Sequence, residues 1–106
     1  MEFESNLIKK YNIKFDITLW TPENIVWLNN LVIPEKFCHK GIGSKLLTAF
    51  TTWLDENKYS SKLLVSDCYG TPINDLIQFY GKFGYTDIET RRKNIYLIRK
   101  YNDGNN

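Results

Sequence analysis

Residues 34–47 read PEKFCHKGIGSKLL, and this stretch decides the fold. It carries a Gly-x-Gly turn, Gly41-Ile42-Gly43, which follows an apolar segment and opens an amphipathic helix at Ser44. Glycines let the backbone come close to a ligand, and the amides at a helix N-terminus point outward without partners. The pattern therefore predicts an anion site at the start of this helix, suited to a pyrophosphate.

A second stretch, LIQFYGKFGY at residues 76–85, places the phenol of Tyr80 on a short helix. A phenol both donates and accepts hydrogen bonds, so it can act as a proton donor at a reacting group. The alternative is an ordinary core tyrosine, because Ile77, Tyr80 and Gly84 share one helical face. Spacing alone favours the core tyrosine.

The composition describes one modest domain over residues 1–106, with its core at about 12–100. The formal net charge is only +2, from 14 basic and 12 acidic residues, so binding of nucleic acid through bulk charge is not indicated. No apolar run reaches the ~20 residues of a membrane span, and the first residues do not resemble a secretory signal.

The cysteine and histidine content points away from disulfide and metal chemistry. Cys38 and Cys68 do not make a disulfide framework, so a reducing, cytoplasmic location is expected. One histidine, His39, and two cysteines do not form a metal site. Nothing near Cys68 would activate it as a nucleophile, and a small buried residue is the better interpretation.

Hydrophobic periodicity predicts five strands and two helices. Residues 13–19 alternate apolar with polar residues, as in a strand with one apolar face, and residues 1–11 fit either a helix or a strand. The other expected elements are strands at 25–33, 62–66, 86–90 and 95–99 and helices at 44–58 and 73–83. The order β-β-α-β-α-β-β indicates an α/β (α+β) fold with helices packed on a mixed sheet.

Asn29 and Asn30 interrupt the otherwise apolar strand at 25–33. A polar pair on one sheet face and a β-bulge both explain them, and the sequence does not choose.

Taken together, the two stretches resemble the GCN5-related N-acetyltransferase (GNAT) superfamily, whose members use acetyl-coenzyme A (acetyl-CoA). The family motif Arg/Gln-x-x-Gly-x-Gly/Ala is matched by residues 38–43, with Cys38 in place of Arg or Gln. The resemblance implies a mixed, mostly antiparallel sheet flanked by helices, with a V-shaped gap between two parallel strands. It also implies a set of cofactor-binding residues: Leu31, Val32 and Ile33 along the pantetheine arm, and Cys38, His39, Lys40, Gly41, Ile42, Gly43 and Ser44 at the phosphates.

The resemblance extends to the catalytic groups. Tyr80 occupies the place of the family's general acid, which protonates the departing coenzyme thiolate. Asn74 resembles an asparagine that many members carry before this tyrosine, one residue closer than usual, and joins the expected cofactor-binding residues. No general base stands out: the candidates are Asp16, Glu23, Asp67 and Asp75, of which Asp67 at a strand end is best placed.

The closest resemblance is to minimal, N-terminally truncated members, including phage-encoded ones. It implies an N-acetyltransferase that transfers acetyl from acetyl-CoA by direct attack of a primary amine, either a protein lysine or a small amine. The alternative is a catalytically degenerate GNAT-fold binding or inhibitor module. Trp20 and Trp27 flank the place of the absent N-terminal unit, so a homodimer through this surface is one expectation and two core tryptophans are the other.

Overall fold

The computed structural model describes residues 3–37, 40–65 and 72–101. In chain order the elements are α1 (Asn6–Lys10), β1 (Lys14–Trp20), β2 (Ile25–Val32), the 3-10 helix η1 (Glu35–Phe37), α2 (Ile42–Glu56), β3 (Ser60–Val65), α3 (Ile73–Gly81), β4 (Asp87–Arg91) and β5 (Asn94–Arg99).

Every strand and helix predicted from periodicity is present, with shifted ends. The helix expected over 44–58 begins earlier, at Ile42, and ends at Glu56. The helix expected over 73–83 ends at Gly81, because the chain turns there and Gly84 takes φ +95°, a backbone conformation that favours glycine.

The N-terminal segment forms α1, where the sequence left helix and strand open. The Ser5 side chain caps this helix, since its Oγ accepts a hydrogen bond from the backbone N–H of Leu7 at 3.3 Å. Leu7 and its neighbours pack against Ile42 and Leu46 of α2. One short helix is thereby held by contacts with a longer one, since five residues are too few to be stable alone.

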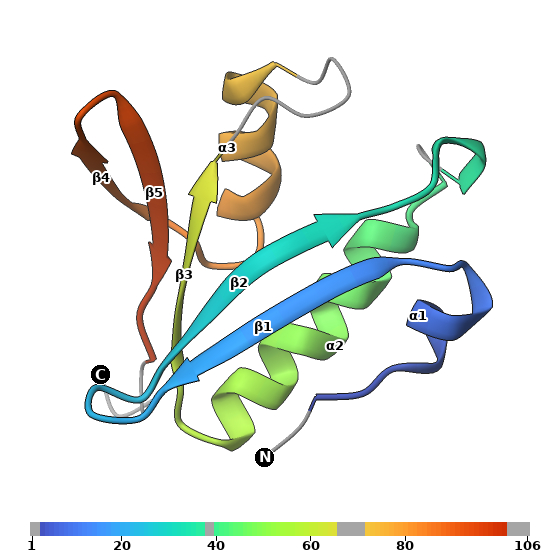
Figure 1. The fold of residues 1–106 in the computed structure, drawn as a ribbon, viewed down its shortest axis with the longest axis horizontal. Helices are drawn as coiled ribbons and strands as arrows, with labels where there is room; N and C mark the ends of the chain where they lie inside the picture. The colour runs from blue at the N-terminus through green and yellow to red at the C-terminus, as the bar shows by residue number, and fades with distance from the viewer. Residues whose placement is uncertain (1–2, 38–39, 66–71, 102–106) are drawn as a thin grey trace.

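The five strands form one mixed sheet in the order β1-β2-β3-β5-β4. β1–β2, β3–β5 and β4–β5 pair antiparallel, and β2–β3 pairs parallel. β2 is therefore an interior strand, as its apolar sequence predicted. The sheet divides into two parts in Figure 1: toward the carboxyl end of β3, the strands β3, β5 and β4 diverge from β1 and β2.

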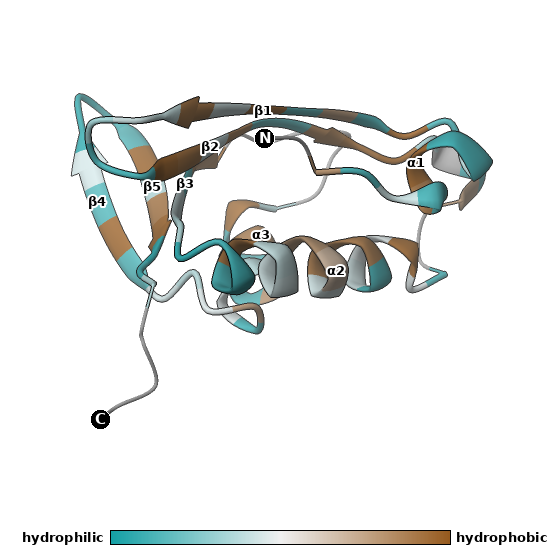
Figure 2. Cartoon of the chain, turned by 90° about the horizontal axis from the view of Figure 1, so that it is seen from below, coloured by the Kyte–Doolittle hydropathy of each residue, from teal (hydrophilic) through white to brown (hydrophobic). Residues whose placement is uncertain are grey.

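The helices α2 and α3 cover one face of the sheet, and the main core lies between them and the strands (Figure 2). The buried side chains of this core come from α2, from the alternate residues of β2, β3 and β5 that face it, and from Tyr85: Val26, Leu28, Leu47, Phe50, Leu54, Leu63, Val65, Tyr85 and Leu97. Burial of this apolar surface is the main favourable term in folding.

Candidate functional site

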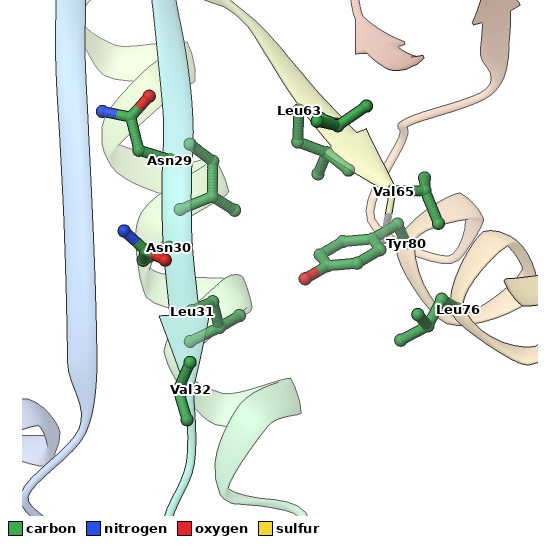
Figure 3. Close-up of a pocket in the computed structure, with 10 residues that line it drawn as sticks. Asn29, Asn30, Leu31, Val32, Leu63, Val65, Leu76 and Tyr80 are labelled. Atoms are coloured by element: carbon green, nitrogen blue, oxygen red, sulfur yellow. The ribbon is translucent and has the colours of Figure 1, made fainter. Parts of the chain in front are cut away.

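A cleft opens between β2 and β3, where the two parallel strands separate. Ile25–Leu28 pairs with Ser60–Leu63, and the pairing stops there although β2 continues to Val32 and β3 to Val65. The strands diverge beyond this point (Figure 1), and Figure 3 shows the cleft between them. Its lining consists of Leu28, Asn29, Asn30, Leu31, Val32, Leu63, Leu64, Val65, Leu76 and Tyr80.

A β-bulge at Asn29 marks the point where β2 leaves β3. Ile17 of β1 pairs with Leu28, but Asp16 pairs with Asn30, so Asn29 is an extra residue on β2. Of the two interpretations that the sequence left open, the structure therefore confirms the bulge. A bulge bends its strand and increases the local twist, which explains why pairing with β3 ends here.

Two side-chain hydrogen bonds tie the bulged part of β2 to β1. Asn29 Nδ2 donates to Thr18 Oγ1 at 2.7 Å, and Asn30 Nδ2 donates to Asp16 Oδ2 at 3.1 Å. Both amide nitrogens therefore point toward β1 and away from the cleft (Figure 3). Among the described residues no strand lies opposite the edge of Leu31 and Val32 that faces the cleft, so an extended ligand can pair there as an added strand.

Tyr80 projects from α3 into the cleft. Its hydroxyl points across the opening toward β2 (Figure 3), while its ring packs edge-on against Phe79 at 5.3 Å and Tyr85 at 5.8 Å between centroids. Leu76, one helical turn earlier, lines the same wall. The fold thus brings the predicted catalytic phenol together with Leu31 and Val32 at one opening.

The start of α2 has the features of an anion site. Gly41 is its N-cap, no side chain of the part of the chain that the structure describes caps the first turn, and that turn contains no acidic residue. Gly41 has φ +76° and open space where a side chain would be. Ser44 and Lys40 are exposed beside these amides, whereas Ile42 is buried. The residues predicted to hold phosphates are therefore partly surface and partly core.

Gly43 is needed for packing as well as for ligand approach. A Cβ at this position would lie 3.0 Å from Cδ1 of Ile33 and 3.5 Å from the Phe79 ring. Gly43 therefore lets α2 pack closely against the chain after β2 and against α3. Ile33 is half-buried beside α2, and it does not line the cleft as Leu31 and Val32 do.

The remaining predicted site residues are placed as follows. Asn74 is exposed on the first turn of α3 and is not part of the cleft lining, so the structure does not bring it to the other residues. Cys38, His39, Asp67 and Cys68 lie outside the described residues.

Among the described base candidates, Asp16 is the one that a hydrogen bond connects to a residue lining the cleft. It accepts a hydrogen bond from Asn30, which lines the cleft, whereas Glu23 lies in the β1–β2 turn and Asp75 in the first turn of α3. The preference for Asp67 over Asp16 rested on strand position alone. Asp16 itself lies on β1, on the side of β2 away from the cleft, and its pairing opposite Asn30 follows from the bulge, a feature of strand register that the sequence does not specify.

Tyr85 is a buried structural tyrosine next to the site. Burial in the apolar core raises the pKa of its phenol well above the ordinary value, against the hydrogen bond to Ser61, which lowers it. Tyr85 donates to Ser61 Oγ at 2.8 Å, and Ser61 donates to the Val26 carbonyl at 2.8 Å. Tyr85 therefore stays protonated and holds the hydroxyl of Ser61, which links β3 to β2 where the two strands still pair.

Trp20 and Trp27 lie on the sheet face that α2 and α3 do not cover. Trp20 is 52% exposed, and Trp27 packs edge-on against Tyr96 at 6.1 Å, with the Lys62 ammonium 5.2 Å from its ring. Neither is part of the helix-covered core. Self-association through this face stays a prediction.

No helix within residues 3–37, 40–65 and 72–101 is long and apolar enough to cross a membrane. In the same part of the chain, no group of three or more histidine, cysteine, aspartate or glutamate side chains is arranged to hold a metal ion.

Comparisons with known proteins agree with this architecture. No protein-family model matches the sequence, and no curated protein matches it. A structure of Arabidopsis thaliana Naa50 in complex with the bisubstrate analogue CoA-Ac-MVNAL is similar over 81% of this chain and 61% of that chain, with 23% identity and a TM-score of 0.55. A structure of Ard1 from Thermoplasma volcanium is similar over 79% of this chain and 58% of that chain, with 23% identity and a TM-score of 0.57.

The chain spans about three fifths of the length of these two proteins, both of which are GNAT-superfamily N-acetyltransferases. The shared architecture is a mostly antiparallel five-stranded sheet with three helices. On its sheet, its separated parallel strands and these two likenesses, the chain has the fold of the GCN5-related N-acetyltransferase superfamily.

Proposed function

We propose that this protein transfers the acetyl group of acetyl-CoA to a primary amine. The observation that carries the proposal is the cleft between β2 and β3, with the Tyr80 hydroxyl directed into it. An open strand edge, a proton donor and an uncapped helix N-terminus occur together at one end of the sheet. The Naa50 likeness supports the choice of ligand, since that protein is bound to a CoA-acetyl analogue.

Each part of the site has a distinct task in binding. The free edge of Leu31 and Val32 pairs with the amides of the pantetheine arm, and the first amides of α2, around Ile42–Ser44, hold the pyrophosphate. Backbone amides at the Asn29 bulge would donate to the thioester carbonyl. Donors fixed at this oxygen stabilise the negative charge that develops on it during attack.

Transfer then requires two proton movements. The acceptor nitrogen forms a bond to the thioester carbon, and the carbon–sulfur bond breaks. Tyr80 gives its proton to the departing thiolate, and the attacking amine loses its proton to water. The acceptor is a protein lysine, an N-terminal amine or a small amine.

Coenzyme binding tests the proposal through a charge placed at the start of α2. Ser44→Glu puts a carboxylate among the first-turn amides, where it repels a pyrophosphate. The same carboxylate stabilises the helix through its favourable interaction with the helix dipole. Affinity for coenzyme A, measured by calorimetry, should fall ~10-fold, while the melting temperature holds or rises.

Thr48→Glu is the matched control, because Thr48 is exposed on the same helix one turn further on. It adds the same charge away from the N-terminus and should change the affinity less than ~2-fold. Equal losses of coenzyme A affinity in both variants would contradict the binding of the pyrophosphate at the N-terminus of α2. A wild-type protein that does not bind coenzyme A would overturn the proposed function.

Thiol release distinguishes the two functional classes. An enzyme releases free coenzyme A when acetyl-CoA and an amine are both present. A binding or inhibitor module of the same fold binds the coenzyme and releases no thiol above the rate of hydrolysis, whichever amine is supplied.

A further inference from the structure

The tip of the β4–β5 hairpin is a basic two-residue turn. β4 ends at Arg91 and β5 begins at Asn94, and these two residues pair across the strands. Arg92 and Lys93 form the turn with φ +47° and +73°. A turn of this kind normally uses asparagine and glycine, because other residues are strained at positive φ. Here two long cationic side chains occupy it.

The charges at this tip differ from those on the rest of the hairpin. Lys100 forms an ion pair with Asp87 at 3.2 Å, and Arg91 forms one with Glu89 at 2.8 Å. Arg92 and Lys93 are exposed, and no carboxylate of the described residues pairs with either of them. Two cations are thus held close together and remain able to pair with an anion from outside.

The tip lies at the end of the sheet where the cleft opens. β5 pairs with β3 through Ile95 with Val65 and Tyr96 with Leu64, and both of these β3 residues line the cleft. The turn follows directly beyond these pairs, at the carboxyl end of β3 (Figure 1). The start of α2 follows β2, on the other side of the cleft. An anion at the tip is therefore separate from a pyrophosphate on α2.

We propose that Arg92 and Lys93 bind an acidic peptide segment of the amine acceptor. The inference rests on the proposed function, since the acceptor amine must reach the same cleft. A turn with two neighbouring cations suits a peptide that carries two or three closely spaced carboxylates. The guanidinium of Arg92 can bind one of these carboxylates bidentately. The chain's small net charge does not favour a nucleic acid as the partner.

Two synthetic peptides test this acceptor class. One carries three aspartates after its free N-terminal amine, and the other carries asparagines in their place. Their dissociation constants are measured by calorimetry on the protein saturated with coenzyme A. Wild type should bind the aspartate peptide ~5–10-fold more tightly, as expected for a few exposed charge pairs, and the preference should shrink in 0.5 M salt.

Arg92→Glu should abolish the preference for aspartate, and Lys58→Glu should keep it. Lys58 is a matched control because it is exposed, has φ +61°, and precedes β3 at the opposite end of the sheet. The double variant Arg92→Asn with Lys93→Gly removes both charges from a turn that these residues suit, so it should lose the preference while remaining folded. Coenzyme affinity should be the same in all of these proteins.

The outcomes separate this inference from the proposed function. Wild type that binds coenzyme A but binds both peptides equally overturns the acidic-acceptor inference and leaves the acetyltransferase proposal standing. A preference that survives Arg92→Glu also overturns it. If a short RNA displaced the aspartate peptide at a lower concentration than the peptide itself needs to bind, the partner of the tip would be a nucleic acid instead of an acidic peptide. If coenzyme A does not bind, the same titrations on the protein alone still test the tip.

Discussion

The two halves of β2 differ in how many neighbours hold the strand. In the closed half, Ile25–Leu28 pairs with β1 and also with Ser60–Leu63 of β3, and buried Ser61 donates a hydrogen bond to the Val26 carbonyl. In the open half, β2 pairs with β1 alone among the described strands, and the side chains of Asn29 and Asn30 add hydrogen bonds to β1. The sheet therefore opens into a cleft where the pairing with β3 ends, at the bulge of β2.

Burial along β3 follows the alternation of its side chains through both halves. Ser61, Leu63 and Val65 are buried, whereas Leu64 between two of them is 46% exposed and lines the cleft. The core-facing residues therefore supply stability, and the other face and the cleft supply ligand-accessible surface. Substitutions of core-facing residues and of Tyr80 in the cleft should separate loss of folding from loss of function.

The largest expected effect is on stability, from Leu63→Ala in the closed half. Removing this buried side chain should lower the free energy of unfolding by about 2–5 kcal/mol, from lost burial and the cavity left behind. Leu64→Ala, its neighbour in the open half, should change it by no more than about 0.5 kcal/mol. Urea unfolding of both variants measures the contrast, and similar losses would contradict the assignment of Leu63 to the core face and Leu64 to the exposed face.

The next effect is on catalysis, from Tyr80→Phe in the open half. If Tyr80 protonates the departing thiolate, kcat should fall ~10²-fold, equivalent to about 2.7 kcal/mol in activation free energy. Coenzyme affinity and stability should change little, because phenylalanine keeps the ring contacts with Phe79 and Tyr85. Thiol release with a primary amine measures kcat, and a wild-type rate would remove Tyr80 from the mechanism.

The smallest expected effect is on stability, from Tyr85→Phe beside the closed half. Loss of the hydroxyl leaves buried Ser61 without its donor and should lower the free energy of unfolding by about 1–2 kcal/mol at pH 7. Activity should be nearly unchanged wherever the variant is folded.

The pH dependence of this loss has a definite sign. Burial raises the pKa of Tyr85 in the folded state above its unfolded value of about 10. The contribution of Tyr85 is therefore present in full below pH ~10 and is lost as the pH rises beyond it, when the unfolded phenol ionises first. Urea unfolding should show a smaller difference in the free energy of unfolding between wild type and Tyr85→Phe at pH 10.5–11 than at pH 7. A difference that stays constant would contradict a buried, protonated Tyr85.

Much of the fold followed from local pattern. The alternation at 13–19 predicted β1, and the apolar run at 25–33 predicted an interior strand, because side chains in a strand alternate between faces. Helix ends were less certain: α2 starts at Ile42 because Gly41 takes positive φ there, a fact of backbone conformation that the residue type permits without requiring.

Part of the site also followed from pattern. Gly41 and Gly43 indicated a turn at a helix start, and Tyr80 lay on a helix, but its direction into the cleft required packing against Phe79 and Tyr85. Leu76 was missed, although its spacing of four residues from Tyr80 places both on one helix face.

The sequence by itself determined the strands, the helices, the glycine turn and the helix that carries Tyr80, because these depend on neighbours along the chain. Only the tertiary structure decided that Asn29 is a bulge, that Asn30 bonds to Asp16, and that Leu64 lines a cleft instead of a flat sheet. Those outcomes depend on register between strands, and register is set by packing of the whole sheet against its helices.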